Sequence, residues 1–135
     1  MTSVKSIVLV GSNPSVQSPD LSAFHPSTKS RKFIDDIFKD TNLNIVYLNL
    51  IDIKLPGNKP LSKSIIKSEL ENIKLKFESY SDTKIIAFGK TASYGLTMVD
   101  IEHFAMPHPS GLCRFWNNEE ASRNKISEMF KWIMS

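Results

Sequence analysis

Two short segments combine side chains that can do chemistry with residues that hold them rigidly. They are VGSNPS (Val10–Ser15) and MPHPSGLCR (Met106–Arg114), and in each a predicted strand leads to Asn or His, then Pro, then Ser. Proline restricts the backbone of the preceding residue, so Asn13 and His108 are expected in fixed orientations. Serine hydroxyls and neighbouring N–H groups are suited to hold a phosphate. The alternative for each segment is a tight turn at the end of a strand.

Other motifs that would define a different chemistry are incomplete. Gly89-Lys90-Thr91 follows a predicted strand, but Lys84 stands where a P-loop needs its first glycine. The three histidines lack the short helical spacing of a zinc motif, and the lone Cys113 has no thiol partner. We therefore expect no metal site. A Gly-x-Ser-x-Gly nucleophile elbow is also absent from the sequence.

The apolar pattern places both segments at the ends of strands. Apolar runs rich in β-branched residues predict strands over Val4–Val10, Leu43–Ile51, Lys84–Phe88 and Glu102–Met106. Helical spacing predicts helices over Ser27–Lys39, with Ser27 or Thr28 as N-cap, over Ser62–Tyr80, directly after Gly89, and from about Glu119 to Met134. Strands that alternate with helices predict an α/β fold with a parallel sheet covered on both faces. Ligands of such sheets bind beyond the carboxyl ends of the strands, which here are Gly11–Phe24, the region after Asn49, and Pro107–Arg114.

Length and composition indicate a single domain that spans residues 1–135. The chain is 41% hydrophobic and 23% charged, which is typical of soluble globular proteins. Its 17 basic and 14 acidic residues give a net charge of +3, which permits a nucleic-acid partner without establishing one. The longest apolar runs are about six residues, far short of a membrane span. Met1–Gly11 lacks the pattern of a secretory signal, and we expect an intracellular protein of the cytoplasm, nucleoid or nucleus.

Taken together and in order, these segments resemble the uracil-DNA glycosylase superfamily. VGSNPS is similar to its first motif in the form used by the mismatch-specific uracil/thymine branch. Phe24-His25-Pro26, followed by Arg31 and a helix, and IIAFGKTASYGL (Ile85–Leu96) resemble the same branch. MPHPSGLCR is similar to the second motif, in which His-Pro-Ser precedes an intercalating leucine. The resemblance implies a three-layer α/β/α sandwich with a four-stranded parallel sheet. It also implies cleavage, without metal or cofactor, of the bond between a damaged or misplaced pyrimidine and deoxyribose.

The resemblance further implies roles for individual residues. His108 matches the histidine that donates to the negative charge developing on the 2-oxygen of the departing base, and Asn13 matches the asparagine that positions the attacking water. Leu112 matches the wedge that fills the space left in the stack by a flipped base. The residues expected to bind the base are Gly11, Ser12, Phe24 and Asn49. The further residues expected to contact DNA are Ser15, Pro109, Ser110, Gly111 and Arg114.

Three of these residues have an alternative role that the sequence leaves open. Phe24 is expected to stack on the flipped ring, but it could instead pack in the core. Asn49 is expected to donate to a base carbonyl and accept from the ring N–H, which favours uracil over cytosine. Its alternative is to cap a turn. Arg114 is expected to bind phosphate, or else to lie on the surface without a ligand.

Three functions are consistent with these observations. The leading hypothesis is a monomeric, monofunctional glycosylase that acts on uracil, or a related pyrimidine, in single- or double-stranded DNA. The second is a non-catalytic module that uses the same cleft to bind nucleic acid or protein. The third is an enzyme that acts on a modified pyrimidine base or a free nucleotide. Base release separates the first from the second, and the preferred ring separates the first from the third.

Overall fold

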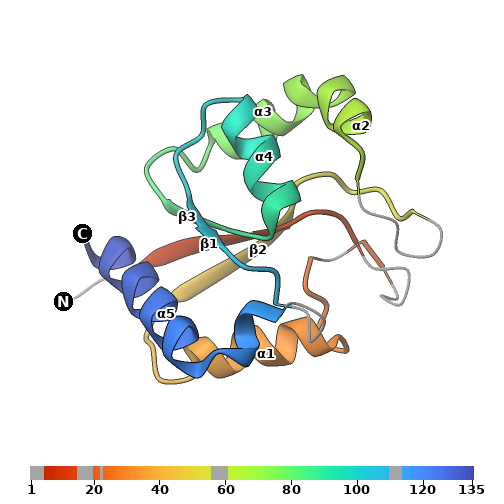
Figure 1. Cartoon of the computed structure of the whole chain (residues 1–135). Helices are drawn as coiled ribbons and strands as arrows, with labels where there is room; N and C mark the ends of the chain where they lie inside the picture. Colours follow the sequence, from red (N-terminus) through yellow and green to blue (C-terminus); the bar gives the residue numbers. More distant parts are fainter. Residues whose placement is uncertain (1–4, 15–19, 22, 56–60, 110–113) are drawn as a thin grey trace.

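A four-stranded parallel sheet in the order β2-β1-β3-β4 forms the centre of the molecule (Figure 1). The computed structural model describes residues 5–14, 20–21, 23–55, 61–109 and 114–135. The strands are β1 (Ser6–Gly11), β2 (Asn44–Asn49), β3 (Lys84–Phe88) and β4 (Phe104–Met106). The central position of β1 explains its sequence, because a strand buried on both faces reads as an uninterrupted apolar run. Ile7–Val10 are accordingly fully buried.

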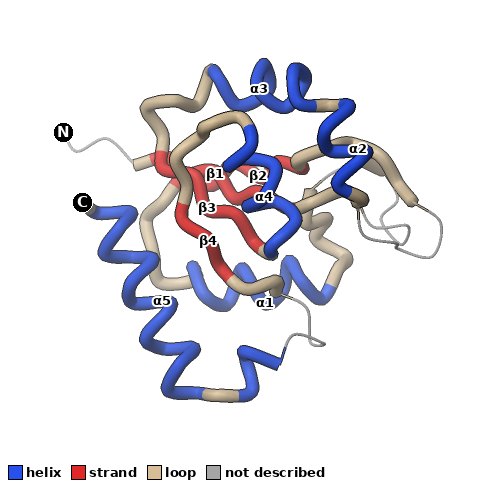
Figure 2. Tube along the Cα trace, turned by 45° about the horizontal axis from the view of Figure 1, so that its top comes forward, coloured by secondary structure: helices blue, strands red, loops and turns tan. Residues whose placement is uncertain are grey.

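Helices cover both faces of this sheet (Figures 1 and 2). Alternate side chains of a strand point to opposite faces, so the strands supply two separate cores. Val8, Val10 and Ile85 pack against α2 (Lys63–Ser68), α3 (Leu70–Glu78) and α4 (Lys90–Met98). Ile7, Leu9 and Phe88 pack against α1 (Lys29–Phe38) and α5 (Glu119–Met134), which a 3₁₀ turn, η2 (Arg114–Asn117), precedes. None of the helices in the described ranges has the length and apolar character needed to cross a membrane.

The α/β class and the four parallel strands are confirmed, whereas one predicted helix is wrong. Ser62–Tyr80 forms two helices, because Glu69 leaves the helical conformation at φ −110° and ψ 10°. Its N–H bonds to Ile66 O, and the Asn72 side chain donates to its carboxylate at 2.6 Å. The apolar stripe continues across this break, with Ile66 and Ile73 both buried. Periodicity alone therefore could not reveal the break.

The edges of other elements also differ slightly from the prediction. Of the two predicted caps of α1, Thr28 is the one used, and its side chain accepts from Arg31 N at 3.3 Å. The strand β4 begins two residues later than predicted. His103 lies just before it, with ring nitrogens 2.8 Å from Ile101 O and 2.7 Å from Ser93 Oγ. These contacts tie the segment before β4 to α4.

Gly95→Ala is expected to lower the free energy of unfolding by about 1–2 kcal/mol, because overpacking a core typically costs about 1–3 kcal/mol. A Cβ at Gly95 would overlap Cδ2 of Leu50, which is itself buried against α4. This cost exceeds the gain of up to about 1 kcal/mol from replacing glycine inside a helix. Urea unfolding measures the change, with Thr97→Ala, an exposed position of the same helix, as control. A Gly95→Ala protein more stable than wild type would refute the close packing.

Candidate functional site

The end of β1 holds the first motif in a fixed arrangement. The segment after β2 extends the pairing beyond the sheet, since Leu50 N donates to Gly11 O at 2.7 Å and Ile51 N donates to Ser12 O at 3.0 Å. The same segment binds Asn13, whose Nδ2 donates to Ile53 O at 2.9 Å. Asn13 Oδ1 accepts from Ser12 Oγ at 3.0 Å. Both ends of the Asn13 amide are therefore oriented by neighbouring groups.

Phe24 lies directly over the end of β1. A Cβ at Gly11 would be 2.9 Å from Cζ of the Phe24 ring, so only glycine permits this approach. The ring also makes edge contacts with Phe88 and Tyr47, at centroid distances of 5.9 and 6.3 Å. Phe24 is half-buried, and these contacts join it to the core between the sheet and helices α1 and α5. The predicted stacking residue thus has the core contacts of its alternative role and also lies beside the motif.

Arg31 holds the backbone of Phe24 in an unusual conformation. Phe24 has φ +49°, a region that non-glycine residues seldom occupy. Arg31 Nη1 donates to Phe24 O at 3.2 Å, and its Nε donates to Asp35 Oδ1 at 2.9 Å. The guanidinium lies 3.9 Å from the centre of the Tyr47 ring. Burial is the main cause that raises the pKa of Tyr47, the charge of Arg31 opposing it. This support was not predictable from the sequence, because Phe24, Arg31, Asp35 and Tyr47 are brought together only by the fold.

Asn49 is buried at the end of β2 and is bound on its donor side. Its Nδ2 donates to Leu21 O at 2.9 Å and to Asp52 Oδ1 at 3.2 Å. Lys76 Nζ donates to Asn49 O at 3.0 Å and to Asp52 Oδ2 at 2.7 Å. Leu21 O and Asp52 Oδ1 fix the orientation of the Asn49 side-chain amide, and together they accept both of its hydrogens. Donation to a base carbonyl would require the release of one bond, so that role stays a prediction, whereas the contacts described fit the capping alternative.

His108 follows β4 and lies against the start of α4. Gly89 adopts φ +97° and its N–H donates to Met106 O at 2.8 Å, while a Cβ at Gly89 would be 3.2 Å from His108 Cδ2. Trp116 Nε1 donates to His108 O at 2.7 Å and fixes the backbone. His108 is partly exposed to solvent. The protein that surrounds the imidazole ring removes part of its hydration, and this desolvation lowers the pKa of His108 below the usual 6.5. A neutral imidazole near pH 7 carries one N–H donor.

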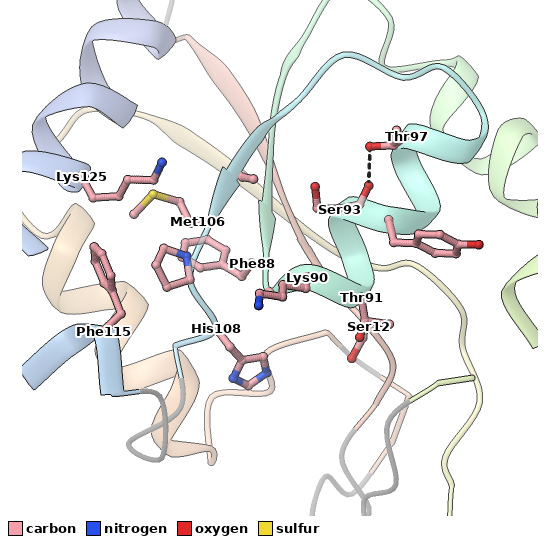
Figure 3. Close-up of a pocket in the computed structure, with 14 residues that line it drawn as sticks. Ser12, Phe88, Lys90, Thr91, Ser93, Thr97, Met106, His108, Phe115 and Lys125 are labelled. Atoms are coloured by element: carbon pink, nitrogen blue, oxygen red, sulfur yellow. Dashed lines mark hydrogen bonds between the residues drawn. The ribbon is translucent and has the colours of Figure 1, made fainter. Parts of the chain in front are cut away.

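A cavity of about 830 Å³ opens from these residues and extends around β4 (Figure 3). Ser12 and His108, from the two predicted motifs, line it together. Asn13 adjoins Ser12 in the chain, and Phe24 contacts Phe88, which also lines the cavity. The structure therefore brings the two motifs to one edge of the sheet. Asn49 lies farther along that edge, at the end of β2.

Much of the cavity wall was not predicted from the sequence. These residues come from α4, η2 and α5, and they are Lys90, Thr91, Ser93, Tyr94, Thr97, Phe115 and Lys125. The one available signal was on α4, which follows a strand end and places Ser93 and Thr97 one turn apart. Phe115 and Lys125 carry no such signal.

Four of the predicted DNA contacts, Ser15, Ser110, Gly111 and Leu112, lie outside the described residues. Pro109 is buried, and Arg114 begins η2. Within the described ranges, no three or more His, Cys, Asp or Glu side chains are grouped so that they could hold a metal ion.

Comparison with known proteins gives one family. The chain matches the model of the Uracil DNA glycosylase superfamily over residues 3–132. Among curated proteins, none matches this sequence. The family match covers both motifs, all four strands and the cavity walls.

Proposed function

The chain belongs to the uracil DNA glycosylase superfamily, and from this premise we propose that it hydrolyses the N-glycosidic bond of uracil, or a related pyrimidine, in DNA. The observation that carries the proposal is the meeting of the two motifs. Ser12, next to the oriented amide of Asn13, lines the same cavity as His108. If Asn13 acts on the sugar side of the glycosidic bond and His108 on the base side, the two residues must lie at the same cavity.

The chemistry begins with a base that has left the duplex stack, because its glycosidic bond is inaccessible inside it. As the bond breaks, the base departs as an anion and the sugar gains oxocarbenium character. The neutral His108 donates its N–H to the 2-oxygen, where the charge develops, without carrying a charge of its own. Asn13 orients a water toward the sugar. The products are a free base and an abasic site, which defines a monofunctional enzyme.

Asn13 limits the speed of this reaction. An amide positions water but is no strong base, so the departing base must be stabilised largely by His108 and by binding energy. Phe24 supplies part of that binding, since its ring lies beside Gly11 where a flipped base can stack. We therefore expect slow turnover.

Incubation with uracil-containing oligonucleotides, followed by alkali, tests the proposal. Alkali breaks the strand wherever a base has been lost, and cytosine and thymine oligonucleotides serve as controls. Strand breakage at uracil by the wild-type protein, absent for Asn13→Ala, supports the assignment. Binding of DNA without breakage at uracil, cytosine or thymine would support the non-catalytic alternative, and breakage at thymine alone would support the third.

Gly11→Ala is expected to raise KM for a uracil oligonucleotide about tenfold, in line with the loss of one stacking contact. The new methyl group must displace the tip of the Phe24 ring, which is the side chain nearest to it. Steady-state kinetics measure KM and kcat, and urea unfolding checks that the fold is retained. An unchanged KM would show that the position of Phe24 is irrelevant to substrate binding.

The rate of base release is expected to be independent of pH from 7 to 8.5, because the lowered pKa of His108 keeps it neutral throughout. Single-turnover rates across this range check the claim. A fall of about tenfold per pH unit would instead indicate that the imidazolium is required. The lowered pKa also favours the folded state above pH 6.5, and this contribution is lost as pH falls below that value, since the unfolded chain binds the proton more readily.

A further inference from the structure

The cavity is too large for a single pyrimidine. Its volume of about 830 Å³ lies in the range of pockets that enclose drug-sized ligands, roughly 300–1,000 Å³. Ser12 and His108 occupy one part of it, and the remainder extends over Ala105 and Met106 of β4. A ring bound beside His108 would leave most of this space unfilled.

The walls beyond His108 have the composition of a site for single-stranded nucleic acid. Phe115 offers an aromatic surface, and the ammonium groups of Lys90 and Lys125 come from different sides of the cavity (Figure 3). Lys125 Nζ lies 4.8 Å from the centre of the Phe104 ring, which keeps its chain close to β4. Aromatic side chains that stack on bases, combined with cations that follow the phosphates, are the common means of binding such strands.

The opposite wall presents hydrogen-bond acceptors. Ile101 O can only accept, so His103 Nδ1 carries the hydrogen in the 2.8 Å contact. In the tautomer whose single hydrogen is on Nδ1, Nε2 accepts from Ser93 Oγ at 2.7 Å. Thr97 Oγ1 donates to Ser93 O at 2.8 Å, which is the bond drawn in Figure 3. In this tautomer both hydroxyl hydrogens are engaged, so the two oxygens have only lone pairs to offer a ligand. They suit a base with an exocyclic amino group.

We infer that the cavity beyond His108 binds a second nucleotide, which is the neighbour of the target nucleotide in the same strand. This inference rests on the proposed function. The neighbouring base stacks on Phe115 with its amino group at Ser93 and Thr97, and its phosphate lies near Lys90 or Lys125. A base in this cavity has left the duplex stack, which adds a second unstacking cost in duplex DNA. The substrate class is therefore single-stranded DNA with adenine, cytosine or guanine beside the target.

Binding to short single-stranded oligonucleotides tests the inference. Each carries 2′-fluoro-2′-deoxyuridine, which resists hydrolysis, and its two neighbours are varied in turn as adenine, cytosine, guanine, thymine or an abasic site. Fluorescence anisotropy gives Kd. We expect an abasic neighbour on one side to weaken binding about tenfold. Thymine there should bind less tightly than adenine, cytosine or guanine, and the duplex should bind less tightly than the single strand.

Three cavity variants and one control complete the design. Phe115→Ala is expected to abolish the effect of the abasic neighbour, and Lys125→Gln to weaken binding of every strand. Thr97→Val replaces an exposed hydroxyl by a methyl group of similar volume, and it is expected to reduce the preference for a base with an amino group. Lys131→Gln removes an exposed charge from α5 outside the cavity and controls for general electrostatics. Phe115 is half-buried, so Lys125→Gln and Thr97→Val keep the test valid if Phe115→Ala fails to fold.

The outcomes separate this inference from the proposed function. Equal Kd for every neighbour on both sides, with variants that bind like wild type, would overturn the second-nucleotide site even if uracil is released. Neighbour discrimination that depends on Phe115 and Thr97 would support the site even if no substrate is cleaved. In that case the glycosylase assignment fails alone.

Discussion

His108→Ala is expected to lower the single-turnover rate of base release about 100- to 1,000-fold, the usual effect of removing one preorganised donor to a developing oxyanion. The bond from Trp116 fixes the backbone at His108, and the imidazole ring lies against Gly89, where a larger residue would crowd it. Alanine removes the donor and leaves the strands and helices untouched. Rapid-quench measurement at saturating enzyme isolates the chemical step.

His108→Gln is the informative companion. Its side-chain amide retains an N–H donor of similar reach, so we expect a smaller loss than for alanine. Circular dichroism and urea midpoints close to wild type would show that both variants are folded. A His108→Ala rate within about twofold of wild type would contradict the role, because loss of a charge-stabilising hydrogen bond costs far more.

Asn13→Ala is expected to reduce the rate by about 100-fold or more, since misplacing a reactant by about 1 Å can cost that much. The amide is fixed by Ser12 Oγ and by Ile53 O, and alanine leaves the attacking water without this orientation. Substrate affinity should change little, so the loss falls on kcat rather than on KM. Single-turnover kinetics with a titration of enzyme concentration separates the two.

Asn124→Ala, at an exposed position of α5, is the matched control and should retain full activity. The double variant Asn13→Ala/His108→Ala should lose less than the product of the single effects, because groups that act in one transition state are not additive. A strictly multiplicative loss would indicate that the two residues contribute independently to the same barrier. Wild-type kcat in Asn13→Ala would remove this residue from the mechanism.

The strands of the sheet were predictable because each is encoded by a short, continuous stretch of the sequence. Ile7–Val10 and Ile85–Phe88 are short apolar runs that end at a glycine, and a strand buried on both faces requires just such a run. The alternation with helices then implied parallel pairing. The break at Glu69 was not predictable, since Ile66 and Ile73 keep the same spacing whether or not the helix is continuous.

The site was predictable only in part. Proline-flanked Asn13 and His108 lie at strand ends, and parallel strand ends meet at one edge, so their proximity follows from the fold class. The engagement of Asn49 does not, because its partners include Leu21 O and Asp52, which are positioned by loops. The same holds for the contact between Arg31 and Phe24 O, which depends on one loop conformation.

The far wall of the cavity shows the same limit. Phe115 and Lys125 belong to the last part of the chain, and they reach the cavity because α5 packs beside β4 and η2 packs against α5. No spacing within the sequence expresses that packing. The hydrogen-bonding role of Ser93 likewise depends on the His103 ring, whose contact with Ile101 O is set by the fold.

Mass-spectrometric detection of free uracil tests the central claim most directly. The purified protein is incubated with a single-stranded oligonucleotide that contains one uracil, and both the small-molecule fraction and the strand are weighed. Hydrolysis predicts free uracil and an unbroken strand that has lost one base and gained the elements of water, with neither product formed by His108→Ala on the same timescale. A strand that stays intact, with uracil still attached under conditions where the protein binds it, would contradict glycosylase activity on uracil.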